Sequence, residues 1–145
     1  GLLTAGEWEV MRMHCVYGCE ILGPLGSKEE ARDTCGDPEK LRQSHTNELL
    51  DLARTLALLH HERWDGTGYP FGLRGADIPM EARIVSVVDV YDALCSVRPY
   101  KNAMDAMDAL AILRNGAGTQ FDPDVIEAFV HHHAEIQEIR ERWKD

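Results

Sequence analysis

Three histidines and one aspartate have side chains that suit metal chemistry. His60 and His61 stand where an apolar segment meets a glycine-rich stretch, and His14 lies inside an earlier helical pattern. Asp89 interrupts an apolar run, where a carboxylate is costly to bury unless it is paired or bound to a metal. Three imidazoles and a carboxylate would form a donor set suited to Fe, Mn or Zn, and two such metals can activate a water against a phosphodiester. Taken singly, each histidine is more often a half-buried polar residue, so the hypothesis requires the four to converge.

Two cations follow the segment that contains Asp89. Arg98 and Lys101 flank a Pro-Tyr pair and could hold a phosphate, the arginine in bidentate fashion and the lysine as a point charge. They fit equally well as cations at the carboxyl end of a helix, where the macrodipole favours positive charge. A run of three histidines at 131–133 resembles a metal tract, but consecutive helical positions fan around the axis, which favours a solvated face.

Four cysteines occur, at positions 15, 19, 35 and 95. Cys15 and Cys19 are four residues apart on an expected helix, a spacing that could serve a metal or redox pair. Small buried core residues are the favoured interpretation of this pair, because free cysteine often behaves as a hydrophobe. No signal peptide is visible at the amino end, so we expect reduced thiols and a cytoplasmic location.

The elements that must position these residues all have helical periodicity. Apolar residues recur at helical spacing over residues 5–22, 47–60, 80–96, 103–115 and 123–143. Capping signals accompany several starts: Thr4 with Glu7, Asn102, and Asp122 followed by Pro123. Residues 63–79 are dense in glycine and proline and predict a structured loop, and residues 27–46 are polar and irregular. The sequence therefore predicts an all-α fold of about five helices, with functional residues at helix ends and loops.

Composition limits the class of partner. The chain has 145 residues, with 15 Lys and Arg against 25 Asp and Glu, for a formal charge of −10. That balance argues against a nucleic-acid polymer or a membrane surface as partner, and no apolar run approaches the length of a membrane span. A small anionic ligand remains compatible, because a metal or a few local cations can hold it. The length predicts one domain.

The glycine-rich loop and its surroundings resemble the HD-GYP family. The resemblance is carried by HHERWDGTGYP at 60–70, GLRG at 72–75, EARI at 81–84, DVYDAL at 89–94, RPYK at 98–101 and GAGTQFDP at 116–123. Upstream, the segments around residues 3–9 and 13–22 match as well. This run covers nearly everything except about residues 27–46 and the last dozen residues.

The resemblance implies a fold, a chemistry and a set of residues. HD-GYP proteins are α-helical, metal-dependent phosphohydrolases that hydrolyse cyclic di-GMP at a site with two or three metals, usually iron or manganese. By motif, the metal ligands are His14, His60, His61 and Asp89. The residues matching contacts to the substrate phosphates are Arg98 and Lys101, and the loop shaping the site is Gly68-Tyr69-Pro70. The expected cofactor is therefore Fe or Mn, with Zn or no metal as alternatives.

Two departures from the family pattern lead to further expectations. The His-Asp doublet that names the family, whose aspartate normally bridges metals, occurs nowhere in these residues. The interval between His14 and His60 is longer than the family pattern, and the excess falls at about 27–46, as in an insertion. We therefore expect residues 1–145 to form a single partial domain, incomplete at its amino end, with weak or no phosphodiesterase activity. Apolar surface left exposed would favour a homodimer.

A non-catalytic module is the alternative function. Such a module would keep Arg98, Lys101 and the 68–70 loop for recognition of a nucleotide or a protein, without turnover. A fragment that folds but has no selected role is a third possibility, because caps and apolar stripes indicate folding and not activity.

Overall fold

The computed structural model describes residues 3–22, 47–97 and 102–143. This part of the chain forms α1 (Ala5–Ile21), α4 (Glu48–Leu59), the short 3-10 helix η1 (Gly75–Asp77), α5 (Met80–Cys95), α6 (Ala106–Asn115), α7 (Pro123–His131) and α8 (His133–Arg142). It contains no strand, only an isolated bridge between Ala117 and Phe121. The predicted all-α fold is confirmed. The expected insertion at 27–46 lies outside the described residues.

Side-chain caps fix the starts of three helices where the sequence predicts them. At α1, the Thr4 hydroxyl accepts the Glu7 N–H at 3.3 Å, and the Glu7 carboxylate accepts the Thr4 N–H at 2.7 Å, a complete capping box. Asn47 caps α4 by accepting two backbone N–H groups, at 3.0 and 3.3 Å. Asp122 caps α7, with Pro123 at its first turn.

Two predicted boundaries are wrong. The fourth predicted helix begins at Ala106 with Asp105 as its cap, and not at residue 103 after Asn102. The Met104 N–H donates to the Leu94 carbonyl at 3.0 Å, which ties the incoming chain to α5 before the helix can start.

The fifth predicted helix is two helices, because the backbone leaves helical geometry at His132 (φ −96°, ψ 11°). The break lets α8 return to α5. His133 is buried there, with its Nε2 2.9 Å from the Tyr91 hydroxyl, and Arg140 donates to the Cys95 carbonyl. The predicted solvated histidine face holds for His131 and His132 and is wrong for His133.

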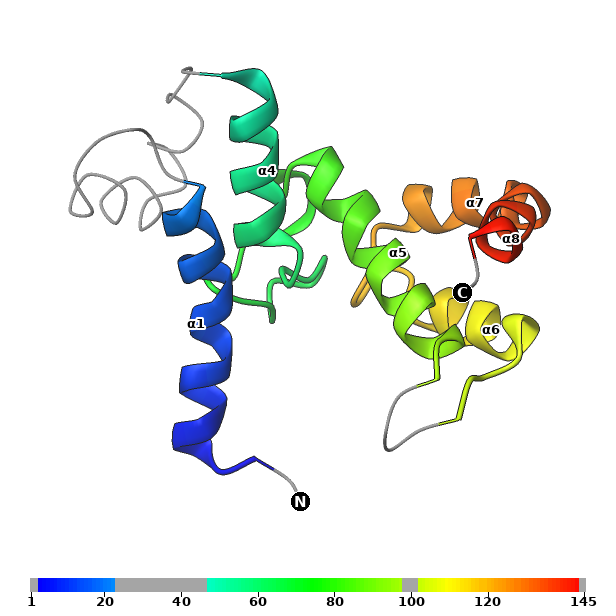
Figure 1. The fold of residues 1–145 in the computed structure, drawn as a ribbon, viewed down its shortest axis with the longest axis horizontal. Helices are drawn as coiled ribbons and strands as arrows, with labels where there is room; N and C mark the ends of the chain where they lie inside the picture. Colours follow the sequence, from blue (N-terminus) through cyan, green and yellow to red (C-terminus); the bar gives the residue numbers. More distant parts are fainter. Residues whose placement is uncertain (1–2, 23–46, 98–101, 144–145) are drawn as a thin grey trace.

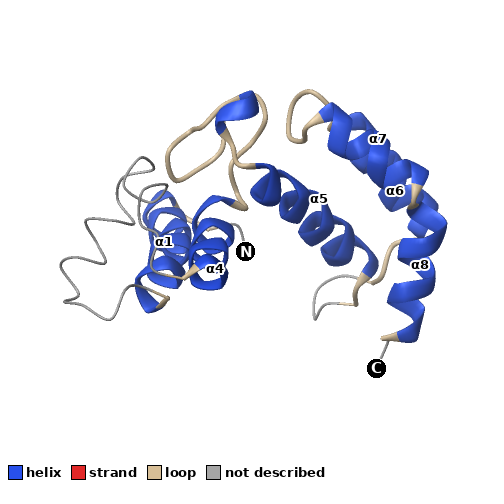
Figure 2. Ribbon diagram, turned by 90° about the horizontal axis from the view of Figure 1, so that it is seen from above, coloured by secondary structure: helices blue, strands red, loops and turns tan. Residues whose placement is uncertain are grey.

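The described helices enclose two hydrophobic cores that share α5. Figure 1 shows α1 and α4 running side by side, with α5 leading away from them to α6, α7 and α8; Figure 2 shows the same order from above. The first core contains Cys15, Cys19, Leu58, Leu59, Ile78 and Ala82. The second contains Val87, Tyr91, Cys95, Ala109, Leu110, Leu113, Phe121, Val125, Ile126 and Phe129. Helix α5 contributes its first turn to one core and the rest of its length to the other.

A polar clamp joins the glycine-rich loop to the turn before α7. The Trp64 N–H donates to the Gln120 carbonyl at 3.2 Å, and the Asp65 N–H donates to the Thr119 carbonyl at 2.9 Å. Beside them Arg83, in the first turn of α5, forms a 2.7 Å ion pair with Asp122. The loop that carries the Gly-Tyr-Pro motif is thus fixed at both cores.

Helix α1 and the start of α4 leave many large apolar side chains exposed. Exposed apolar residues of α1 and the start of α4 are Trp8, Val10, Met11, Met13, Tyr17, Ile21, Leu49, Leu50 and Leu52. None of the described helices is long and apolar enough to cross a bilayer. Cys15 and Cys95 are free and buried, whereas Cys19 is disulfide-bonded, so the expectation of four reduced thiols is wrong for Cys19.

Candidate metal centre

Three imidazole rings meet where α1 packs on the carboxyl end of α4. The ring centroids of His14 and His60 are 5.7 Å apart, those of His14 and His61 5.0 Å, and those of His60 and His61 4.0 Å. The close approach of the helices depends on Gly18, because a Cβ there would lie 3.2 Å from the Ala57 Cβ. Residues 46 positions apart in the sequence therefore share one site.

Backbone carbonyls orient two of these rings. His14 Nδ1 lies 2.6 Å from the Met11 carbonyl oxygen, and His60 Nδ1 lies 2.8 Å from the Leu56 carbonyl oxygen. Each Nδ1–H donates to its carbonyl, which leaves the lone pair on Nε2. Metal-binding histidines usually have this arrangement, because the second hydrogen bond fixes both tautomer and ring orientation. The donor set therefore fits a divalent cation.

The third ring is held in its neutral form. Burial lowers the pKa of His61 to about 4, with further lowering by the neighbouring His60 and His14, while Asp89 acts in the opposite direction. A neutral imidazole is the form that binds a metal, so His61 needs no deprotonation at neutral pH.

Asp89 lies on the same hollow as two of the histidines. A cavity of about 180 Å³ is lined by His60, His61, Glu62, Arg63, Tyr69, Ser86, Asp89, Val90 and Gln120. Asp89 is exposed and comes from the middle of α5, so a third helix contributes to the site. The four residues that the sequence nominates as ligands thus surround one region, and their role as ligands stays a prediction.

Cys15 is a candidate donor that the sequence interpretation did not assign to this site. Its Sγ lies 3.5 Å from His14 Nε2, and the donor atoms of His14, Cys15, His60 and His61 all lie within 4.8 Å of one another. Burial raises the pKa of the Cys15 thiol to about 11. In the sequence Cys15 directly follows His14, and this position was the feature that could have indicated it. The four-residue spacing to Cys19 had suggested a different pair.

A buried carboxylate shapes the Gly-Tyr-Pro loop. Glu62 is 3% exposed, and its two oxygens accept the N–H groups of Phe71 at 2.8 Å and Leu73 at 2.9 Å. Burial raises the pKa of Glu62, although these backbone N–H groups oppose that effect. Gly68 packs directly on this segment, since a Cβ there would lie 2.3 Å from the Arg63 nitrogen. The loop is therefore pressed against the residues that follow His61.

The loop brings an aromatic ring to the histidines. The Tyr69 ring centroid is 4.9 Å from that of His61, and Tyr69 lines the same cavity. The Arg12 guanidinium also lies over the Tyr69 ring, with its carbon 5.2 Å from the ring centroid. Of the predicted 68–70 triplet, Tyr69 thus borders the site while Gly68 allows the loop to approach it.

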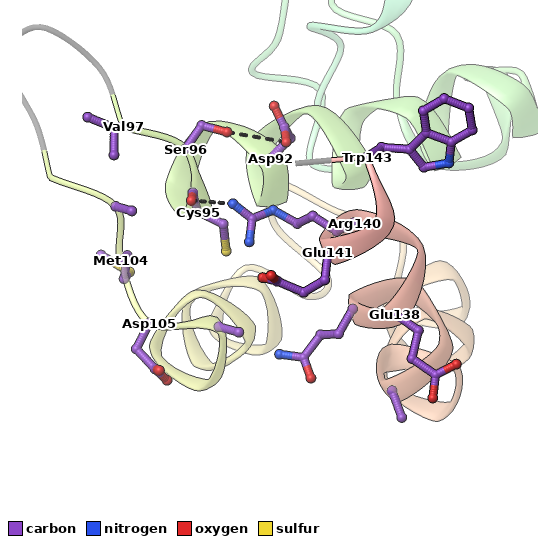
Figure 3. A pocket seen from close by; sticks show the side chains of 14 residues that line it. Asp92, Cys95, Ser96, Val97, Met104, Asp105, Glu138, Arg140, Glu141 and Trp143 are labelled. Carbon is purple, nitrogen blue, oxygen red and sulfur yellow. Dashed lines mark hydrogen bonds between the residues drawn. The ribbon is translucent and has the colours of Figure 1, made fainter. Parts of the chain in front are cut away.

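The predicted phosphate contacts Arg98 and Lys101 lie outside the described residues. On either side of them, Val97 and Ala103 line a larger cavity of about 980 Å³ between the end of α5, the start of α6 and α8. Figure 3 shows Arg140 donating to the Cys95 carbonyl across this cavity and Ser96 bonded to Asp92. None of the three clustered histidines lines it, so the chemistry indicated by the imidazoles belongs to the smaller cavity.

Comparison with known proteins identifies the family. The model of the HD domain matches residues 2–125. The chain belongs to the HD-domain family. Curated relatives of this HD domain include a probable cyclic di-GMP phosphodiesterase of Vibrio cholerae, 40% identical over the whole chain and 30% of the relative. A cyclic di-GMP phosphodiesterase of Thermotoga maritima is 37% identical over the whole chain and 34% of the relative.

Further relatives agree with this assignment. A 3'3'-cGAMP-specific phosphodiesterase of V. cholerae is 34% identical over the whole chain and 24% of the relative. The crystal structure of a cyclic GMP-AMP specific phosphodiesterase of V. cholerae has a TM-score of 0.52 at 21% identity, covering 79% of this chain and 27% of that one, and supports the HD-domain-like fold. The HD-GYP resemblance is confirmed, and phosphodiester hydrolysis is the family chemistry. The chain spans about a third or less of the length of these relatives.

Proposed function

We propose that this HD domain binds a divalent cation through His14, His60, His61 and Asp89, and that the centre serves the hydrolysis of a cyclic dinucleotide. The single observation that carries the proposal is the meeting of three imidazoles, one from α1 and two from the turn that ends α4, with ring centroids 4.0 to 5.7 Å apart. The relatives named for cyclic di-GMP make that dinucleotide the proposed substrate.

The remaining residues take roles around that cation. When bound, a divalent cation activates water and neutralises charge on a phosphodiester. Arg98 and Lys101 would hold the phosphate oxygens, and Tyr69 would form a wall of the site. The HD-GYP resemblance favours Fe or Mn, with Zn as the alternative that the same nitrogen donors accept.

We propose weak or absent turnover for these 145 residues by themselves. They contain no His-Asp doublet, so Asp89 is the one carboxylate in the proposed ligand set. A single negative charge is too little to hold two divalent cations close together, and one cation lacks the bridged water of a two-metal site. For these 145 residues by themselves, this favours the alternative function, a module that binds the nucleotide or a protein partner without hydrolysing it.

Replacing His60 by alanine tests the metal centre. The His60→Ala variant, dialysed against Mn²⁺, Fe²⁺ or Zn²⁺ and analysed for bound metal, should retain at least tenfold less than the unaltered chain. His131→Ala is the matched control, because His131 is an exposed histidine outside the cluster. Equal metal content in the two variants would overturn the proposed centre.

Product analysis and calorimetry separate the enzyme from the binding module. The metal-loaded chain should release linear dinucleotide from cyclic di-GMP far more slowly than a curated relative assayed beside it, and comparable turnover would contradict the weak-activity proposal. In calorimetry, cyclic di-GMP should release heat with the unaltered chain and less with Arg98→Ala. Absence of heat with both would rule out the nucleotide-binding alternative.

We also propose a homodimer that covers the exposed apolar side chains of α1 and the start of α4. Nine large apolar side chains are exposed there, among them Val10 at 72% and Ile21 at 84%, and apolar surface of this extent favours a partner subunit. Sedimentation equilibrium at micromolar concentration should give twice the chain mass, and a monomer would contradict the proposal. The expected cytoplasmic location stays a prediction.

A further inference from the structure

We propose that Arg12 is a substrate-binding residue beside this centre, and that it holds the phosphate of a cyclic dinucleotide that is not being cleaved. The inference rests on the proposed function and adds a specificity-determining contact to it, separate from the proposed metal ligands.

Arg12 is an exposed residue of α1 whose side chain packs on two aromatic rings. Its guanidinium carbon is 5.2 Å from the centroid of the Tyr69 ring and 5.8 Å from that of the Trp8 ring. Trp8 precedes Arg12 by about one helical turn, whereas Tyr69 comes from the loop after His61. The cation is therefore held by both α1 and the loop, and it is still open to solvent.

The Tyr69 ring connects this cation to the histidines. Its centroid is 4.9 Å from that of His61, and Tyr69 lines the cavity that His60, His61 and Asp89 also line. The Arg12 guanidinium carbon is thus no farther from the centre of the His61 ring than the sum of the two distances through Tyr69. This separation suits a small ligand that carries two phosphates in one covalent ring.

The N–H donors of Arg12 are not used by the part of the chain that the structure describes. No carboxylate in that part forms an ion pair with Arg12. A guanidinium that packs on rings through its face keeps the donors at its edge for a planar acceptor such as a phosphate. Arg63 lines the same cavity, but its Nε donates to the Thr67 hydroxyl at 2.9 Å and its Nη2 lies 3.5 Å from an Asp65 oxygen. Of these two arginines, Arg12 is the one whose donors are free for a ligand.

Charge explains why the second phosphate needs such a contact. The chain has a formal charge of −10, and a cyclic dinucleotide carries a negative charge on each of its two phosphates. The proposed divalent cation, with Arg98 and Lys101, neutralises the phosphate that is cleaved. The other phosphate would face an acidic protein without a counter-charge, and a local cation supplies one. A mononucleotide has a single phosphate and makes no use of this contact.

Calorimetry of the Mn²⁺-loaded full chain with cyclic di-GMP and with GMP tests the contact. Arg12→Gln should weaken binding of cyclic di-GMP roughly tenfold or more, because a bidentate charge-assisted contact is lost, and should change GMP binding little. Arg12→Lys should lose less, since lysine keeps the charge without the planar fork. Arg114→Gln is the matched control, because Arg114 is exposed on α6, and it should bind both nucleotides as the unaltered chain does. Equal weakening for the two nucleotides in Arg12→Gln would overturn the inference.

Metal content and Tm of the same variants separate a substrate contact from a structural role of Arg12. Both should be unchanged in Arg12→Gln, and a loss of metal like that expected in His60→Ala would mean that Arg12 only supports the loop, which contradicts the inference. If cyclic di-GMP binding is unchanged in Arg12→Gln and lost in His60→Ala, the inference is wrong and the proposed function stands. If the unaltered, metal-loaded chain binds no cyclic di-GMP, both are wrong.

Discussion

Glu62 is a buried carboxylate whose two oxygens each accept a backbone N–H of the following loop. In Glu62→Gln the amide NH₂ replaces one acceptor and faces a backbone donor, so one buried N–H loses its partner. We expect a loss of about 1–3 kcal/mol in the free energy of unfolding, the usual cost of an unsatisfied buried group. Urea unfolding of the metal-free chain measures this loss.

Glu48→Gln is the matched control for that measurement. Glu48 is exposed in the first turn of α4, so its substitution should change the unfolding midpoint little. Equal midpoints for the two variants would show that the Glu62 bonds do not hold the loop. A lower unfolding midpoint in Glu62→Gln alone would show that Glu62, which directly follows the two histidines, stabilises the loop.

Residue types in the sequence indicated most of the centre but not all of it. His60 and His61 could be nominated because imidazoles at a helix end beside a glycine-rich loop are typical of metal sites, and His14, inside a helix, because it matches the HD-GYP motif. Cys15 could not be assigned, because neighbouring positions on a helix point about 100° apart and its direction depends on how α1 packs on α4. The role of Glu62 depends on where the chain turns at residues 71–73, which spacing alone does not give.

Helix α1 depends on a cap that contains a titratable group. Hydrogen bonds from the Thr4 side chain, and then from its backbone, lower the pKa of Glu7 below its usual value. A carboxyl with a lower pKa in the folded state stabilises the fold above its unfolded pKa of 4.5 and loses that effect as the pH falls through the folded pKa. The stability difference between the unaltered chain and Glu7→Ala should therefore be largest near neutral pH and shrink in acid.

Thermal unfolding of both chains from pH 7 to pH 3 measures this convergence, with Glu9→Ala as control because Glu9 lies in the same exposed helix outside the cap. If the difference in Tm between the two chains stays constant from pH 7 to pH 3, the cap does not depend on the Glu7 charge.

Element boundaries were predictable where a side-chain cap marks them and failed where tertiary contacts decide. Thr4, Asn47 and Asp122 sit at true helix starts. Asn102 is an acceptable cap by residue type, but the bond between Met104 and Leu94 delays the helix to Ala106. The break at His132 has no local breaker such as glycine or proline, and it occurs where His133 turns inward to Tyr91.

At the scale of the molecule, the Arg83–Asp122 pair holds the site loop between the two cores. Asp122 is 2% exposed and Arg83 14% exposed, and Arg83 also lies over the Trp64 ring at 5.7 Å. Arg83→Met should reduce the free energy of unfolding by about 3–5 kcal/mol, because it leaves a buried carboxylate without its cation. The double variant with Asp122→Asn should recover part of this, since asparagine still caps α7.

A double-mutant cycle in guanidinium chloride measures that coupling. Additive effects of the two substitutions would show that the pair does not act as a unit. The sequence predicted the all-α class from periodicity alone, but the clamp joins residues 39 positions apart and only the fold reveals it.

Gly68 limits which positions around the candidate site can be substituted in a redesigned protein. A methyl group at that position would meet the Arg63 nitrogen at 2.3 Å and the Glu62 Cα at 2.6 Å, both of them backbone atoms that cannot swing aside. A mutant library of the cavity wall can therefore vary Ser86, Val90 and Gln120. Substitutions at position 68 would prevent correct folding, so their effect on specificity could not be measured.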